Sequence, residues 1–289
     1  MAKVITVMNM KGGVGKTTIT ANLGGLLGLS KINGKNRRVL LIDYDPQFNL
    51  SQTLIPPKIY FSHAEEKKTI LSVLMPSDTL LDPFNLKIPD IEATPSVDSL
   101  VVNIIPTLKN GCLHVIPSTL DLMYLALGET DTATSTRIDR RFENFILDCR
   151  SKYDLIFIDC HPAGSIFTRT ALRNSDHVLI PVGPSKFASR GVGLMKQFID
   201  SAHANKSAPE AHILFNYAPK IGVYKEEEEI RANPRLTKLC LVKNLKKYSA
   251  FSELNEGRGF VWHNKKAHST AAFTNLYFVA TELAERIGA

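Results

Sequence analysis

One short segment near the start of the chain constrains its fold more than any other. Lys11-Gly-Gly-Val-Gly-Lys-Thr-Thr18 ends in the Gly-Lys-Thr of a P-loop, in which consecutive backbone N–H groups and a helix N-terminus hold phosphate groups. The β-branched run at 4–7 predicts a strand before it, and apolar residues at helical spacing over 17–30 predict a helix after it. Strand, loop and helix in this order predict an α/β fold with a phosphate-binding turn.

The rest of the chain alternates predicted strands with predicted helices. The strands are predicted at 4–7, 39–43, 113–116, 155–159, 177–182 and 213–217, and the helices at 17–30, 137–149, 192–204 and 270–287. This alternation predicts a doubly wound, mostly parallel sheet with helices on both faces, whose ligands bind at the carboxyl ends of the strands. We expect the 289 residues to form a single domain, 1–289.

Two regions depart from the alternation. Seven prolines break every candidate element between residues 54 and 111, so we expect an irregular insertion there with one short helix near Thr69 to Leu74. Residues 220–266 contain eleven Lys or Arg against six Glu, a net +5 of the +7 that the whole chain carries. This local surplus favours a polyanionic partner without requiring one.

Composition excludes several classes of protein. Hydrophobic residues at 44% and charged residues at 22% are typical of soluble globular chains and not of disordered or fibrous ones. The four cysteines have neither zinc-site spacing nor the density of a disulfide scaffold. The apolar run before Lys11 is too short for a signal peptide, and no window approaches a membrane span. We expect a cytoplasmic protein with reduced thiols and no membrane partner.

The loop differs from the strict P-loop pattern in one informative way. Met10 stands where that pattern has glycine, and a second lysine, Lys11, enters the loop. The segment resembles the KGG-x-GK-[ST]-T loop of the deviant Walker A ATPases, the ParA/MinD family. The resemblance implies a P-loop ATPase that uses ATP and Mg²⁺, and it gives Lys11 the role of reaching the nucleotide of a partner subunit. The residues expected at the nucleotide are Lys11, Gly12, Gly13, Val14, Gly15, Lys16, Thr17 and Thr18, with Lys16 on the β/γ-phosphates and the Thr17 hydroxyl on Mg²⁺.

Later segments resemble further motifs of the same family. Residues 41–49 resemble its D-x-DPQ-x-N segment, which implies that Asp45 positions the attacking water and that Asp43 supports the metal. Residues 154–162 resemble the Walker B strand, which implies that Asp159 holds a metal-bound water. His161 replaces a proline of that motif, and either a nucleotide-sensing or a structural role stays open. Asn216 matches a position where the family often contacts adenine, although a polar strand end is an equal reading.

The resemblance is strongest to the ParA branch. It implies an ATP-dependent homodimer that binds double-stranded DNA nonspecifically, is associated with the nucleoid, and is released when a ParB-like centromere-binding partner stimulates ATP hydrolysis. Phosphate neutralisation by Lys and Arg supplies nearly all nonspecific DNA affinity. The candidate DNA contacts are Arg190, Lys196, Lys243, Lys246 and Lys247, each of which also fits an ordinary solvated charge.

Four alternative functions would each require residues of a particular kind. A MinD-like membrane ATPase would carry a C-terminal helix rich in Lys and Arg, but the last predicted helix has only Arg286 against two Glu. An iron–sulfur reductase component would need bridging cysteines, and a GTPase would need Asn-Lys-x-Asp, whereas the nearest string here is 264–267, Asn-Lys-Lys-Ala. Distribution of a protein cargo by the same ATPase stays open. No helix-turn-helix precedes the first predicted strand, so sequence-specific repression is not expected.

Overall fold

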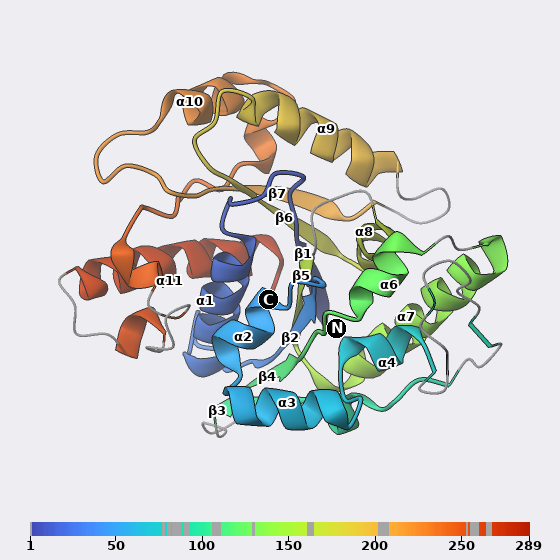
Figure 1. Ribbon diagram of the computed structural model, residues 1–289. Helices are drawn as coiled ribbons and strands as arrows, with labels where there is room; N and C mark the ends of the chain where they lie inside the picture. Colours follow the sequence, from blue (N-terminus) through green and yellow to red (C-terminus); the bar gives the residue numbers. More distant parts are fainter. Residues whose placement is uncertain are drawn as a thin grey trace.

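The structure is a computed structural model of the chain. It describes residues 2–76, 79, 82, 88–89, 93–105, 111–128, 131–160, 165–201, 208–252, 254, 260–263 and 268–289. Within these residues, seven strands form one sheet in the order β3-β4-β2-β5-β1-β6-β7 (Figure 1). The strands are β1 (Lys3–Val7), β2 (Arg38–Tyr44), β3 (Val102–Ile105), β4 (Cys112–Ile116), β5 (Leu155–Cys160), β6 (His177–Val182) and β7 (Glu210–Phe215).

All neighbouring strands pair in parallel except β3, which runs antiparallel to β4 at one edge. The inner strands are apolar without alternation, and every residue of β5 and β6 is buried, as expected for strands covered on both faces. Parallel neighbours require a crossover connection, and the helices between the strands provide it. The doubly wound, mostly parallel fold predicted from the sequence is therefore confirmed.

Helices cover both faces of this sheet, and each face has its own apolar cluster. The helices are α1 (Lys16–Leu29), α2 (Asn49–Leu54), α3 (Pro57–Glu65), α4 (Ile70–Leu74), α5 (Val97–Leu100), α6 (Leu122–Leu127), α7 (Thr132–Lys152), α8 (Ile166–Arg173), α9 (Ala188–Ser201), α10 (Lys225–Ala232) and α11 (Ser269–Arg286), with short 3₁₀ turns η1 (Thr237–Leu239), η2 (Ser249–Ser252) and η3 (Val261–His263). Helices α1 and α11 lie together on one face, and α4, α6, α7 and α8 lie on the other (Figure 1).

The expectation of an irregular insertion over residues 54–111 is wrong for its described part. This stretch contains α3, α4, α5 and the edge strand β3, whereas only the helix near 69–74 was expected. Proline does not always break a helix: Pro57 is the first residue of α3, where the missing N–H costs nothing. The segment is also tied to α7, since the buried guanidinium of Arg141 donates to the carbonyl oxygens of Ser72, Val73 and Ala93.

Two element boundaries also differ from the sequence-based expectation. Strand β7 begins at Glu210 and not at Ile213. Its first part includes the polar residues Glu210 and His212, which lie opposite His177 and Leu179 of β6 in the parallel pairing. Helix α9 covers Ala188–Ser201, so it begins before the predicted 192–204 segment; residues 202–204 lie outside the described part. In the described residues, no helix has the length and apolar character required to cross a bilayer.

Candidate phosphate-binding site

The glycine loop joins the carboxyl end of β1 to the first turn of α1. Gly13 (φ 73°) and Gly15 (φ 87°) adopt left-handed backbone conformations that favour glycine. Helix α1 begins at Lys16 with no side-chain cap and no acidic residue in its first turn. No acidic residue of the helix itself competes for its N-terminal N–H groups, and the positive end of the helix favours an anion.

Two asparagines hold this loop in place. Asn216 follows β7, is 3% exposed, and donates from Nδ2 to the Val14 carbonyl at 2.9 Å. Asn9 donates to the Pro181 carbonyl at 2.7 Å and accepts from the Lys11 backbone N–H at 3.0 Å. The loop is thus fixed to the sheet by side chains that come from opposite ends of the sequence.

The adenine contact expected of Asn216 stays a prediction. Within the protein, its Nδ2 supports Val14 and its Oδ1 accepts from the Tyr217 N–H at 2.9 Å, which leaves one amide N–H and one lone pair for a further partner. The Nδ2 atom lies 2.4 Å from where a Cβ on Gly15 would be placed. These contacts favour a structural role for Asn216 in shaping the loop, and they explain why residue 15 must be glycine.

A cleft of about 580 Å³ opens directly over the loop. This volume lies within the range of small-molecule sites, which is roughly 300–1,000 Å³. Its lining residues are Gly12, Gly13, Gly15, Lys16, Thr17, Thr18, Asp45, Gln47, Asn49, Gln52, Thr53 and Tyr217. Six of the eight predicted loop residues and Asp45, which follows β2, therefore meet around one cleft, whereas Lys11 and the buried Val14 do not line it.

Two buried carboxylates lie behind the floor of this cleft. Asp43 is 0% exposed and accepts from the Ser51 N–H at 2.7 Å and the Ser51 hydroxyl at 2.6 Å, both at Oδ2. Asp159 is 2% exposed and accepts from the hydroxyls of Thr17 and Thr20, the latter at 3.2 Å. Burial, and then the nearby Asp159, holds the pKa of Asp43 well above its usual range. Burial also raises the pKa of Asp159 to about 7, against smaller opposing effects from Thr17 and Lys16.

These groups fit a hard divalent cation. The Oδ1 atom of Asp43 is buried and has no hydrogen-bond partner, and the Thr17 hydroxyl lies beside the Asp159 carboxylate. Carboxylate and hydroxyl oxygens are the ligands that Mg²⁺ prefers, usually together with waters and substrate phosphates. The donor set at the start of α1 and the ends of β2 and β5 therefore suits Mg²⁺.

Asp45 lies closer to the opening than the other two acids. Its side chain is half-buried, and its Oδ1 accepts from the Gln47 N–H at 2.9 Å. Its backbone carbonyl accepts from the Ser118 hydroxyl at 2.7 Å, and the Ser118 N–H in turn donates to Ser51 Oγ at 2.9 Å. A chain of hydrogen bonds through Ser51 and Ser118 thus connects the Asp43 side chain to the Asp45 backbone. No sequence motif indicated these two serines.

Lys11 and the candidate DNA contacts lie outside the cleft. Lys11 is exposed at the edge of the loop. Lys196 on α9 pairs with Asp200, Lys243 lies 5.7 Å from the centre of the Phe278 ring, and Lys246 donates to the Lys220 carbonyl. Arg190 and Lys247 are exposed. Lys243, Lys246 and Lys247 share one segment, whereas Arg190 and Lys196 belong to α9. His161 lies outside the described residues.

Several residues that support the site belong to no recognised sequence motif. Asn9, Ser51 and Ser118 position the loop and the acids, and Tyr217 lines the cleft beside Gly15. Only Asn9, which lies two residues before the loop, could have been suspected from its sequence neighbourhood. Ser51 follows the 41–49 segment closely, whereas Ser118 and Tyr217 are brought to the site from distant parts of the chain.

Comparisons with known proteins agree with this geometry. The model of a family described as an AAA domain matches residues 2–210. The sporulation initiation inhibitor protein Soj of Bacillus subtilis is 32% identical over 192 residues, 66% of this chain and 62% of Soj. The chromosome partitioning protein ParA of Myxococcus xanthus is 28% identical over 206 residues, 69% of this chain and 59% of that protein.

Among solved structures, a plasmid partition protein from Borrelia burgdorferi aligns with a TM-score of 0.67 at 23% identity, over 97% of this chain and 100% of that one. This likeness concerns the fold. The chain spans about half the length, 52%, of the first curated relatives that it matches. The family match over most of the chain, the loop with its second lysine and the seven-stranded sheet agree, and the chain belongs to the ParA-type P-loop ATPases of the ParA/MinD family.

Proposed function

We propose that this protein is a ParA-like partition ATPase. It binds ATP with Mg²⁺, forms a homodimer around the nucleotides, and binds double-stranded DNA nonspecifically on the nucleoid in the cytoplasm. A ParB-like centromere-binding partner then stimulates hydrolysis, and the dimer releases DNA. The observation that carries this proposal is the position of Lys11. It is exposed beside a cleft that is lined by Lys16 and Asp45.

The chemistry follows from the positions of the side chains. The N-terminus of α1 and the Lys16 ammonium would hold the β- and γ-phosphates, and Thr17, Asp159 and Asp43 would hold Mg²⁺. Bound Mg²⁺ supplies charge neutralisation at the phosphate oxygens. Asp45 accepts a hydrogen bond from the attacking water and orients it toward the γ-phosphate. Phosphoryl transfer needs mainly positioning and charge stabilisation, so these groups suffice once the site is closed to solvent.

The rim of the cleft supports a dimer. Exposed apolar side chains follow the carboxyl ends of three neighbouring strands: Met10 after β1 (41% exposed), Phe187 after β6 (76%) and Ile221 after β7 (93%). The carboxyl ends of parallel strands meet at one edge of the sheet, so these side chains surround the same edge as Lys11. A second copy placed face to face would cover them and would bring its own Lys11 to the nucleotide.

The charge distribution favours DNA as the partner of this dimer. The glutamates of α10 are partly neutralised within the helix, where Glu227 pairs with Arg231 and Glu229 pairs with Lys225. The following segment, 233–247, carries the exposed cations Lys243 and Lys247. A membrane role for the last helix is disfavoured, because its apolar residues Leu276 and Leu283 are buried in the same cluster as α1.

The proposal is tested with the full chain and a slowly hydrolysed ATP analogue. We expect sedimentation to show dimers with the analogue and monomers with ADP, and Lys11→Ala to abolish the dimer while Lys31→Ala, which removes an exposed lysine distant from the cleft, leaves it intact. Filter binding of unrelated duplexes should show little sequence preference and a steep fall in affinity with salt. Dimers that bind no duplex would instead favour a protein cargo, and analogue-loaded monomers would contradict the proposal altogether.

A further inference from the structure

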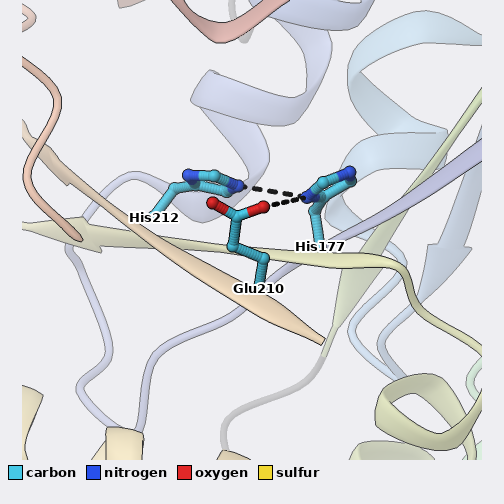
Figure 2. A group of neighbouring side chains, drawn as sticks. All are labelled: His177, Glu210 and His212. Carbon is cyan, nitrogen blue, oxygen red and sulfur yellow. Dashed lines mark hydrogen bonds and ion pairs between the residues drawn. The ribbon is translucent and has the colours of Figure 1, made fainter. Parts of the chain in front are cut away.

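Three side chains converge at the end of the sheet opposite the cleft. His177 is the first residue of β6, Glu210 is the first residue of β7, and His212 follows two positions later (Figure 2). His177 Nδ1 lies 3.1 Å from His212 Nε2 and 3.7 Å from a Glu210 carboxylate oxygen. One nitrogen or oxygen atom from each residue lies within 4.8 Å of the other two, the one such cluster found in the described part of the chain.

The sheet register places these side chains on one face. His177 pairs with Glu210 across the parallel strands, and side chains two positions apart on a strand share a face, so His212 joins them. Leu179 and Leu214, the next residues on that face, belong to the apolar cluster shared with α1 and α11. The imidazoles are consequently buried, with His177 at 6% and His212 at 1% exposure, whereas the Glu210 side chain is 63% exposed.

The electrostatic surroundings keep both histidines neutral. Burial lowers the pKa of His212 to about 4, with smaller contributions from His177 and Arg286. Burial and Lys3 lower the pKa of His177, while Glu210 and Asp176 act in the opposite direction. Asp176 is itself paired with Arg150 at 2.8 Å, and Arg286 is paired with Glu282 at 3.2 Å. Neutral imidazole is the form of histidine that coordinates metals.

The two converging atoms are His177 Nδ1 and His212 Nε2, while His177 Nε2 is buried without a partner whether or not an ion is bound. The separation of the two converging nitrogens also fits a shared metal ion. Two nitrogens bound to a tetrahedral Zn²⁺ at roughly 2.0–2.1 Å lie about 3.3 Å apart. The observed 3.1 Å separation is close to that value and requires only a small displacement.

We propose that His177 Nδ1, His212 Nε2 and the Glu210 carboxylate form a binding site for a borderline transition-metal ion, Zn²⁺ being the best fit. Two imidazoles and one carboxylate leave a fourth tetrahedral position, and the exposure of Glu210 lets water occupy it. Mg²⁺ and Ca²⁺ favour oxygen ligands throughout, so this site is chemically distinct from the one at the P-loop.

Such an ion would connect the amino ends of β6 and β7. Strand β7 runs from this cluster to Asn216, which holds the Val14 carbonyl of the phosphate loop. The ion would therefore stabilise the strand that supports the loop from behind, without contacting nucleotide. The proposal does not depend on ATP hydrolysis or on DNA binding.

The test uses the full chain, stripped of metal with a chelator and held in excess Mg²⁺ to occupy oxygen sites. Titration with Co²⁺ is followed by its visible absorption, Zn²⁺ is then added in competition, and thermal unfolding is recorded with and without Zn²⁺. We expect one ion per chain, Co²⁺ bands of a four-coordinate site, and a higher Tm with Zn²⁺. His177→Gln and His212→Gln should each weaken binding by about 100-fold or more, and Glu210→Gln by about 10-fold. His263→Gln, which removes an exposed histidine elsewhere, should bind as the unchanged chain does.

Absence of stoichiometric binding by the unchanged chain would overturn the proposal, as would equal affinity in all three variants. If the histidine variants fail to fold, Glu210→Gln decides, because this exposed side chain does not contribute to the core. In that case unaltered Co²⁺ affinity in Glu210→Gln would exclude the site, and a loss with an intact fold would support it.

Discussion

Asp43 and Asp159 are paired in register on the neighbouring strands β2 and β5, and both carboxylates are buried. Each is the acid of a separate motif, more than a hundred residues apart in the chain. Burial raises the pKa of both side chains, and the charge of Asp159 adds to this effect at Asp43 as the charge of Asp45 does at Asp159. The paired acids therefore cost stability in the absence of a cation and provide a strong site in its presence.

Asp43→Asn should separate these two effects. We expect the free energy of unfolding of the metal-free protein at pH 7 to rise by roughly 1 kcal/mol or more, because a buried, unfavourably placed carboxylate is removed. The affinity for nucleotide with Mg²⁺ should fall at the same time. Urea unfolding without Mg²⁺ and nucleotide titrations at varied Mg²⁺ measure the two quantities. A loss of stability without metal would show that the carboxylate is needed for the fold itself.

Asp45 and Lys16 should differ in the step that they affect. Asp45→Ala should retain ATP and lose turnover by about 100-fold or more, since it removes only the group that orients water. Lys16→Ala should lose ATP binding, because the proposal has its ammonium contact the phosphates in the ground state. Fluorescent-nucleotide binding and phosphate release distinguish the two, and robust turnover by Asp45→Ala would remove our assignment of that carboxylate.

Gly15→Ala should abolish nucleotide binding through its contact with Asn216. The added Cβ would lie 2.4 Å from Asn216 Nδ2 and 3.1 Å from the Tyr217 hydroxyl, on a backbone with φ 87°. Gly34→Ala is the matched control, because Gly34 has a similar φ of 74° and open space around it. Both variants should lose about 1 kcal/mol or more of stability from backbone strain. Equal nucleotide affinity in the two variants would contradict the role of the contact.

His114 should make stability depend on pH. Its Nδ1 lies 2.7 Å from the Tyr153 hydroxyl, and burial, followed by the charge of Arg38, lowers its pKa. Between the unfolded pKa near 6.5 and the lower folded value the unfolded state binds more protons, so stability falls as pH decreases through that range. In urea unfolding at pH 8 and pH 5, the unchanged chain should lose more stability than His114→Gln. An equal loss in both proteins would mean that His114 titrates normally.

The inner part of the fold was predictable from local sequence. The strands β1, β2, β4, β5 and β6 are apolar runs buried on both faces, and such runs indicate a strand without tertiary information. The edges were not predictable in this way. Strand β3 lies at one edge of the sheet and pairs antiparallel with β4. Strand β7 begins with the exposed Glu210 and includes the polar His212 two positions later, so its first half lacks the apolar pattern by which a strand is recognised in the sequence.

The residues of the candidate site also fall into those that local sequence predicts and those that it does not. The sequence determined the groups that must be adjacent in the chain: the glycines that permit φ above zero at 13 and 15, Lys16 and Thr17 at the helix start, and an acid near the end of β2 and of β5. These are local requirements of backbone geometry and charge. Only the tertiary structure decided which distant side chains support them, as Asn216 supports Val14 and Ser118 supports Asp45, and which face of β6 and β7 brings His177 to His212. Strand order and register set those contacts, and both depend on the packing of the whole sheet, which no short segment of sequence contains.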